Sequence, residues 1–264
     1  MKTKLHQISA YVIHLLKAQR RGHGVHSPFV YWLCEEVFYN QQAFYEFEKL
    51  NDLRKKLQNE VTLIPVLDLG AGSQKLAAQE RTIAAIARHG ISTHQQAELI
   101  FRLIHALRHQ TRIELGTSIG LTTLYMQAAN NSGNTYTIEG NPALSNFAKN
   151  LADEHLYSGI RYLQGNFDQQ LPELLAQLKQ VDFLYIDGNH QYEATLRYVK
   201  AALPYVKPNS VILLDDIYWS PQMTKAWKTL CTWPEVTLSL DLYHFGLLFF
   251  REELKEKQHL SLLI

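Results

Sequence analysis

The sequence is poor in cysteine and almost free of net charge. Its 264 residues include only two cysteines, Cys34 and Cys231, which lie far apart and lack the spacing of metal ligands. We expect them to be the reduced, structural thiols of a cytoplasmic protein. The 26 basic side chains nearly balance the 25 acidic ones, so the overall charge gives no signal for binding nucleic acid.

Long apolar runs are also missing, and no segment is long enough to cross a bilayer. Residues 1–20 place Leu5, Ile8, Val12 and Leu15 at helical spacing among polar residues. This pattern predicts an amphipathic helix rather than a signal peptide. Such a helix packs on its own protein, joins two copies into a homodimer, or docks on a membrane surface.

Two glycine signatures of nucleotide binding are absent. A dinucleotide-binding loop that began at Gly116 would need glycines at positions 118 and 121, where Ser118 and Leu121 stand. No glycine precedes the Lys-Ser or Lys-Thr pair of a P-loop. These absences exclude a P-loop enzyme and disfavour a nicotinamide oxidoreductase.

What the sequence does contain is a regular alternation of strands and helices after residue 110. It predicts an α/β fold with a Rossmann-like doubly wound sheet, mostly parallel with a terminal antiparallel strand pair. An N-terminal helical extension or lid (residues 1–92) would precede a cofactor-binding domain (residues 93–264). The predicted strands are 111–115, 135–139, 160–163, 181–186, 210–215, 235–242 and 245–251, and the predicted helices are 4–19, 29–58 with a break near Asn40, 74–108 with a break near Gly90, 120–130, 142–155, 168–179, 191–205 and 221–230.

Two acids mark the ends of the first two strands of this domain. Glu114 is followed by a loop that contains Gly116 and Gly120, and Glu139 ends the next strand. Such a loop brings backbone N–H groups and a helix N-terminus toward a ligand. A carboxylate at the position of Glu139 can accept hydrogen bonds from both hydroxyls of a ribose. The pattern therefore predicts a nucleotide-like cofactor.

Three segments, residues 114–120, 138–140 and 185–190, resemble motifs of the class I S-adenosylmethionine-dependent methyltransferases, in particular their O-methyltransferase-like branch. The resemblance covers residues 95–251 and implies O-methylation of a hydroxyl on a small-molecule acceptor. The absence of an Asn/Asp-Pro-Pro-aromatic motif argues against methylation of a base amino group. A non-catalytic binding protein with a helical partner-binding N-terminus is the alternative. The resemblance implies that the S-adenosylmethionine site contains Glu114, Gly116, Thr117, Ser118, Gly120, Glu139, Asn166, Phe167 and Asp187.

The same resemblance suggests a divalent cation. In metal-dependent members, the positions of Asp187, Asp215 and Asp216 bind metal, and carboxylate oxygens suit Mg²⁺, Ca²⁺ or Mn²⁺. A structural role is equally open, because Asp216 can cap a turn and Asp215 can accept backbone hydrogen bonds. His190 stands where those relatives have lysine. It is either the catalytic base, acting beside Asp187, or a helix cap.

Two loops have no assigned role. Residues 20–28 form either a linker, in which Ser27 and Pro28 start a helix, or a lid that carries His23 and His26. Residues 66–73 contain a glycine-rich turn, but no second strand ending in an acid follows it. We interpret this segment as a strand and turn outside the main sheet.

Overall fold

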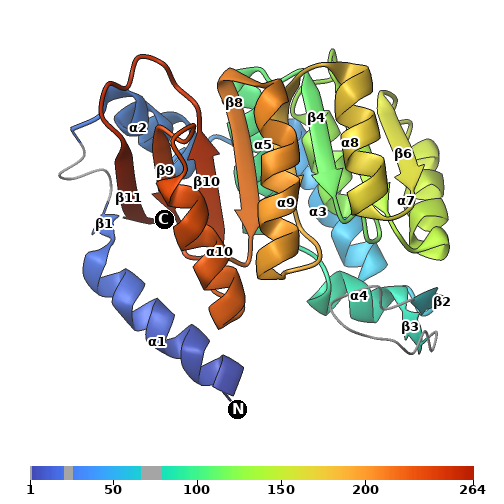
Figure 1. Ribbon diagram of the computed structural model, residues 1–264. Coiled ribbons are helices and arrows are strands. Elements are labelled where there is room, and N and C mark those ends of the chain that lie inside the picture. Colours follow the sequence, from blue (N-terminus) through green and yellow to red (C-terminus); the bar gives the residue numbers. More distant parts are fainter. Residues whose placement is uncertain (1, 21–25, 67–78) are drawn as a thin grey trace. The chain divides into compact units, whose positions relative to one another are not determined.

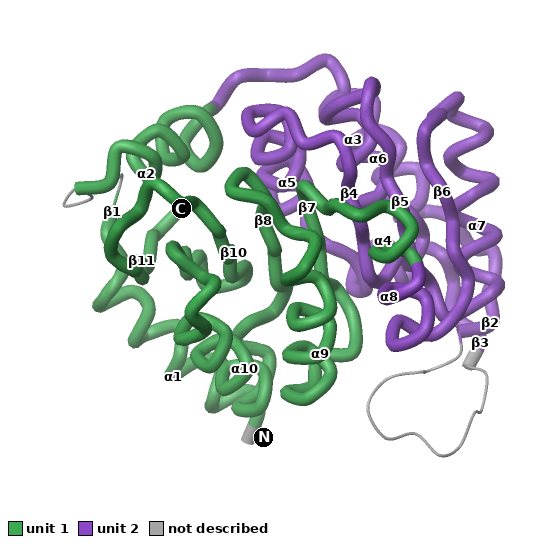
Figure 2. The backbone as a smooth tube through the Cα atoms, turned by 45° about the horizontal axis from the view of Figure 1, so that its top comes forward, with its two compact units in different colours: residues 1–40, 174–264 green, residues 41–173 purple. Residues whose placement is uncertain are grey.

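The chain alternates between helices and strands as the sequence predicts, and the computed structural model describes residues 2–20, 26–66 and 79–264 (Figure 1). The chain divides into unit 1, residues 1–40 and 174–264, and unit 2, residues 41–173 (Figure 2). The boundary predicted between residues 92 and 93 does not coincide with a boundary of these units. The predicted N-terminal extension and cofactor-binding domain stay predictions. His23 and the turn at residues 67–73 lie outside the described residues.

Unit 2 contains three parallel strands in the order β4 (Thr111–Leu115), β5 (Asn134–Glu139) and β6 (Ile160–Gln164). Four consecutive residues of β4 are buried, as expected for a parallel strand covered on both faces. Helices α6 (Leu121–Ala128) and α7 (Pro142–Glu154) connect the strands, and α8 (Phe167–Leu178) follows β6. On the N-terminal side, α3 (Tyr45–Leu57) and α5 (His94–Leu107) both pack against α6.

A separate two-stranded antiparallel sheet joins β2 (Leu63–Val66) to β3 (Gln79–Thr82). Of the strand and turn predicted at residues 66–73, only Val66, in β2, lies within the described residues. The prediction of helix at residues 79–82 is wrong, because Thr82 is extended and its hydroxyl accepts a hydrogen bond from the Ala85 amide at 3.1 Å. That cap starts α4 (Ile83–His89).

Unit 1 contains the strand order β1-β11-β9-β10-β8-β7. The pair β7 (Val181–Ile186) and β8 (Val206–Asp215) is parallel, whereas β10 (Phe245–Phe249) is antiparallel to both β8 and β9 (Leu238–Asp241). The predicted terminal antiparallel pair and the mostly parallel α/β fold are thus confirmed. Strands β11 (Gln258–Leu263) and β1 (Gln19–Arg20) were not predicted, and they add two parallel strands at the edge.

Helices complete unit 1. They are α1 (Lys2–Lys17), α2 (Pro28–Leu33) with the π-helical turn η1 (Cys34–Phe38), α9 (Tyr192–Ala202) with the 3₁₀ turn η2 (Leu203–Tyr205), and α10 (Pro221–Thr232). Ser27 caps α2 and Pro28 begins it, as predicted, and the helix ends near Asn40. In the described part of the chain, no helix combines the length and the apolar character needed to cross a membrane.

Candidate functional site

The ends of β4, β5 and β6 form one polar edge of unit 2. The Gly116 amide donates to the Ile138 carbonyl at 3.0 Å, and the Gly165 amide donates to the Glu139 carbonyl at 2.9 Å. These bonds hold the residues after each strand next to those after its neighbour. The predicted cofactor residues of the first two strand ends are therefore brought together.

The loop between β4 and α6 has an unusual backbone. Gly116, Ser118 and Gly120 all have positive φ angles, of 105°, 51° and 82°. A Cβ atom on Gly120 would lie 2.7 Å from the Cβ atom of Ala148, so only glycine allows α6 to approach α7 this closely. A non-glycine residue such as Ser118 in the left-handed region is uncommon and concentrates at functional loops.

Glu139 is bound by the amides of this edge. Its Oε2 accepts a hydrogen bond from the Ser118 amide and its Oε1 accepts one from the Asn141 amide, both at 2.9 Å. Burial raises the pKa of Glu139, and the loop amides oppose this effect by stabilising the carboxylate. Each carboxylate oxygen has a further lone pair, so the side chain is oriented and can still accept two hydroxyl hydrogen bonds.

Glu114 lies deeper and supports the loop from beneath. Its side chain is fully buried, and its Oε2 accepts hydrogen bonds from the hydroxyls of Thr123 at 2.5 Å and Thr137 at 2.6 Å. Its Oε1 has no hydrogen-bond partner among the described residues. Burial raises the pKa of Glu114 to about 7 despite both hydroxyls. We interpret Glu114 as a loop-supporting group rather than a solvent-facing ligand.

The third strand end of unit 2 carries Asn166 and Phe167. The Asn166 side-chain oxygen accepts the Asp168 amide at 2.8 Å, and its carbonyl accepts the Gln170 amide at 2.9 Å. Asn166 therefore starts α8, a structural task that does not depend on a ligand. Phe167 is half-buried. Their predicted position beside an adenine ring stays a prediction.

Unit 1 has its own polar strand ends, at β7 and β8. Asp215 is buried, its Oδ2 accepts the Tyr185 hydroxyl at 2.6 Å, and its Oδ1 accepts the Asp216 amide at 2.8 Å. Burial and the charges of Asp187 and Asp216 raise the pKa of Asp215 well above its usual range. The Tyr185 hydroxyl opposes this rise by donating to the carboxylate.

Asp187 and His190 form a loose pair at the end of β7. His190 Nε2 lies 3.9 Å from Asp187 Oδ1, and each side chain is 25% exposed. This separation is too long for a hydrogen bond but suits an ion pair. Helix α9 has Gln191 at its cap position and no side-chain cap bond. The alternative that His190 caps this helix is therefore not supported, and its imidazole stays available.

The three aspartates do not by themselves form a metal site. The described residues contain no group of three or more His, Cys, Asp and Glu side chains arranged to hold a metal ion. Asp215 Oδ2 accepts the Tyr185 hydroxyl, and its Oδ1 accepts the Asp216 amide. A divalent cation at Asp187, Asp215 and Asp216 stays a prediction, and we route no chemical step through a metal.

Several residues that shape the ends of β4 and β5 were not predicted as site residues. Asn141 caps α7 through the amides of Ala143 and Leu144, and its side-chain nitrogen donates to the Pro65 carbonyl at 3.0 Å. The Asn-Pro pair at positions 141 and 142 is a helix-start signal that was available. The two threonines that bind Glu114 carried no such signal, because threonine is common in strands and helices alike.

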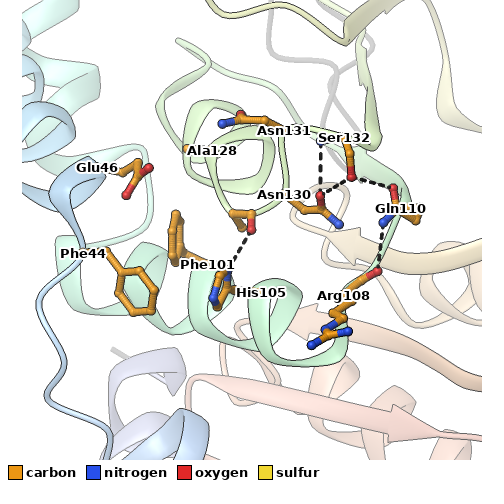
Figure 3. Close-up of a pocket in the computed structure, with 11 residues that line it drawn as sticks. Phe44, Glu46, Phe101, His105, Arg108, Gln110, Ala128, Asn130, Asn131 and Ser132 are labelled. Carbon is orange, nitrogen blue, oxygen red and sulfur yellow. Dashed lines mark hydrogen bonds between the residues drawn. The ribbon is translucent and has the colours of Figure 1, made fainter.

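A hollow in unit 2 lies at the opposite edge of its strands. This cavity of about 520 Å³ is lined by Phe44, Phe101, His105 and Arg108, and by residues 128–132, which precede β5 (Figure 3). His105 Nδ1 lies 3.1 Å from the Ala129 carbonyl oxygen. Ligands of parallel sheets bind beyond the carboxyl ends of the strands. This cavity is at the amino ends and is separate from the Glu139 edge.

Comparison with known proteins agrees with this geometry. Residues 113–217 match the family model described as a methyltransferase domain. This match begins in β4 and extends past the end of β8, so it includes every predicted site residue. No curated protein matches the chain significantly. The matched residues make up less than half of the chain.

Solved structures of similar fold are O-methyltransferases. A putative O-methyltransferase from Klebsiella pneumoniae has 14% identity and a TM-score of 0.56, covering 80% of this chain and 92% of its own. The O-methyltransferase of tomaymycin synthesis from Streptomyces achromogenes, solved with S-adenosylmethionine, has 16% identity and a TM-score of 0.56, covering 84% and 95%. A Podospora anserina methyltransferase bound to S-adenosylhomocysteine has 15% identity and the same score, covering 81% and 99%. At these identities the likeness shows the Rossmann-like fold alone.

Proposed function

We propose that this protein transfers the methyl group of S-adenosylmethionine to a hydroxyl of a small molecule. The observation that carries the proposal is the carboxylate of Glu139, held by the Ser118 and Asn141 amides at the edge where the glycine loop ends. A carboxylate fixed in this way is preorganised to bind the two ribose hydroxyls of the cofactor. The methyltransferase-domain match and the cofactor-bound solved structures support the same assignment.

The loop residues have distinct tasks in this proposal. Gly116, Thr117, Ser118 and Gly120 bring the N-terminus of α6 toward the methionine portion of the cofactor, while the Ser118 amide holds Glu139. The Thr117 hydroxyl, at 2.5 Å from that of Thr137, connects the loop to the threonines around Glu114. Glu114 thereby fixes the conformation of the loop from the buried side.

The proposed chemistry needs only alignment and removal of one proton. When bound, S-adenosylmethionine supplies a methyl group on a positively charged sulfur that leaves as a neutral thioether. His190 accepts the proton of the acceptor hydroxyl, whose oxygen then forms the new bond to the methyl carbon, giving a methyl ether. Asp187, 3.9 Å away, stabilises the imidazolium that results.

Binding of S-adenosylhomocysteine, measured by titration calorimetry, tests the proposal directly. We expect micromolar affinity, unchanged by EDTA, and a loss of about 100-fold in Glu139→Ala, because two charge-assisted hydrogen bonds to the ribose contribute about 3 kcal/mol together. Glu154→Ala removes an exposed carboxylate at the end of α7 and serves as the matched control. Unchanged affinity in Glu139→Ala would contradict the proposed role.

The non-catalytic alternative has no observation in its favour. Turnover of any hydroxyl acceptor would exclude it, and a His190→Asn variant should then lose turnover while it retains S-adenosylhomocysteine affinity. If His190→Asn left turnover unchanged, another group would be the base. NADH titration under the same conditions, with no heat expected, tests the oxidoreductase interpretation.

We also propose a cytoplasmic location and a small-molecule acceptor without nucleic acid. Both cysteines are unpaired, and burial raises the pKa of Cys34 to about 11 and of Cys231 to about 12. Such protonated thiols are unreactive and fit a reducing compartment. A homodimer is a further prediction, which sedimentation of the purified protein tests.

A further inference from the structure

Helix α1 faces the rest of unit 1 with its polar side. His6 Nε2 lies 2.9 Å from the Thr224 hydroxyl of α10, the Gln7 amide donates to the Trp219 carbonyl at 3.1 Å, and His14 Nδ1 lies 3.2 Å from Asp241 Oδ1. The side chain of His14 is almost completely buried. An amphipathic helix on a soluble core normally does the reverse and buries its apolar side.

The apolar side of α1 is correspondingly exposed. Leu5, Ile8 and Leu16 are 62%, 61% and 81% exposed, and Val12 is 50% exposed. At 100° per residue these four side chains fall within an arc of about 80° on the helix surface. Tyr11 and Ile13 flank that arc and are also exposed. We call these six side chains the outer face of α1.

The charges that α1 and α10 carry are all of one sign. Helix α1 contains no aspartate or glutamate, Lys4 and Lys17 are exposed near its two ends, and Arg20 is exposed just beyond it. Helix α10, which α1 contacts through His6, also lacks acidic residues and exposes Lys225 and Lys228. A surface of this kind attracts an anionic partner.

We propose that the outer face of α1 docks on an anionic lipid surface. Six apolar side chains are suited to the acyl boundary of a bilayer and have no use in a nucleic-acid interface. Basic side chains at the helix ends can reach the headgroups of anionic lipids. A second copy of the chain fits less well, because pairing two α1 helices would place lysines opposite lysines with no carboxylate on either helix.

The docked helix would lie parallel to the membrane plane. Its anchor to unit 1 remains intact in this arrangement, since His6, Gln7 and His14 make their contacts on the side away from the lipid. Trp219, whose carbonyl accepts the bond from Gln7, is 52% exposed, and its ring centre lies 6.5 Å from that of His190. The proposed base and the helix are thus parts of the same end of unit 1.

Co-sedimentation of the full-length protein with vesicles tests the proposal. One set of vesicles is pure phosphatidylcholine, and the other contains about one third phosphatidylglycerol. We expect binding to the anionic vesicles, weakening as salt is raised, and little binding to the neutral ones. Lys4→Glu and Lys17→Glu should each weaken anionic-vesicle binding about fivefold or more, because each removes a favourable charge.

The double variant Ile8→Asp/Val12→Asp should weaken binding more than about tenfold, because it places two carboxylates in the acyl boundary. Both positions are exposed, so circular dichroism and the urea midpoint should stay unchanged. Val61→Asp, at a 78% exposed position of unit 2, is the matched control and should bind as the unaltered protein does.

Two outcomes would overturn the proposal. The first is equal binding, or no binding, to neutral and anionic vesicles. The second is a stable dimer in lipid-free buffer that Ile8→Asp/Val12→Asp dissociates, which would assign the outer face to a second copy of the chain.

Discussion

The buried carboxyl of Glu114 should make the stability of the protein fall as pH rises. Its pKa is about 7 in the folded protein, against 4.5 for the unperturbed group. The unfolded chain therefore releases this proton at lower pH than the folded chain does. Below pH 4.5 the carboxyl is neutral in both the folded and the unfolded chain, and the free energy of unfolding is undiminished. Between pH 4.5 and about 7 the free energy of unfolding falls progressively. At about 1.4 kcal/mol per pH unit, the full loss above pH 7 is about 3 kcal/mol.

The substitution Glu114→Gln isolates this effect. The amide cannot ionise, so the free energy of unfolding of the variant does not fall as pH rises. Its side-chain nitrogen would replace the unpartnered Oε1, which costs about 1–2 kcal/mol. That cost is the same at every pH. Urea unfolding at pH 4.5, 6 and 8 should show the variant gaining about 3 kcal/mol relative to the unaltered protein between the extremes.

The control for this experiment is Glu154→Gln, at an exposed position on α7, which should show no such gain. If the difference between Glu114→Gln and the unaltered protein stayed constant across the pH range, Glu114 would titrate near its ordinary pKa and its burial would not have the effect assigned to it.

Three further substitutions test packing and the anchor of α1. Gly120→Ala places a methyl group 2.7 Å from the Ala148 Cβ atom at a φ of +82°, so it should cost about 2 kcal/mol or more in urea unfolding; Gly90→Ala, at a negative φ, should cost less. In Gly246→Ala the new methyl group would lie 2.6 Å from the buried Trp227 ring, so the free energy of unfolding should fall by a similar amount. Adding Trp227→Leu in a double variant should recover part of that loss. Burial raises the pKa of Asp241, but hydrogen bonds from His14, Tyr218 and the Tyr243 amide lower that pKa overall. The stabilisation by Asp241 is therefore present at neutral pH and lost in acid. Asp241→Asn should lower the free energy of unfolding by about 3 kcal/mol at pH 7, unlike the exposed Glu252→Gln. An Asp241→Asn protein as stable as the control would refute the anchoring role.

The sequence predicted the strand ends of the domain well because their signals are local. Glu114, Gly116, Gly120 and Glu139 follow a strict order of strand, turn and helix, and the positive φ of two of them demands glycine. Strands β4 and β7 are short, and all but one residue of each is buried, as expected for parallel strands covered on both faces.

The errors arose where structure depends on distant residues. Strand β11 has no clear alternation, and it is a strand because β9 offers it an edge through the pairing of Leu260 with Leu240. Asp215 also has a distant partner, since the phenol of Tyr185 binds it from the neighbouring strand. Spacing along the chain gave no indication of either contact.

The two ends of the chain meet in unit 1, and this has a consequence for biosynthesis. Helix α1 leaves the ribosome long before its partners, because its His14 contacts the carbonyl of Leu262, 248 positions later. Residues 19 and 20 likewise pair with residues 262 and 263. Unit 2 can therefore complete its fold on the ribosome before the partners of α1 are synthesised, and both sides of α1 are exposed until then. Any chain that terminates early would release α1 without its anchor.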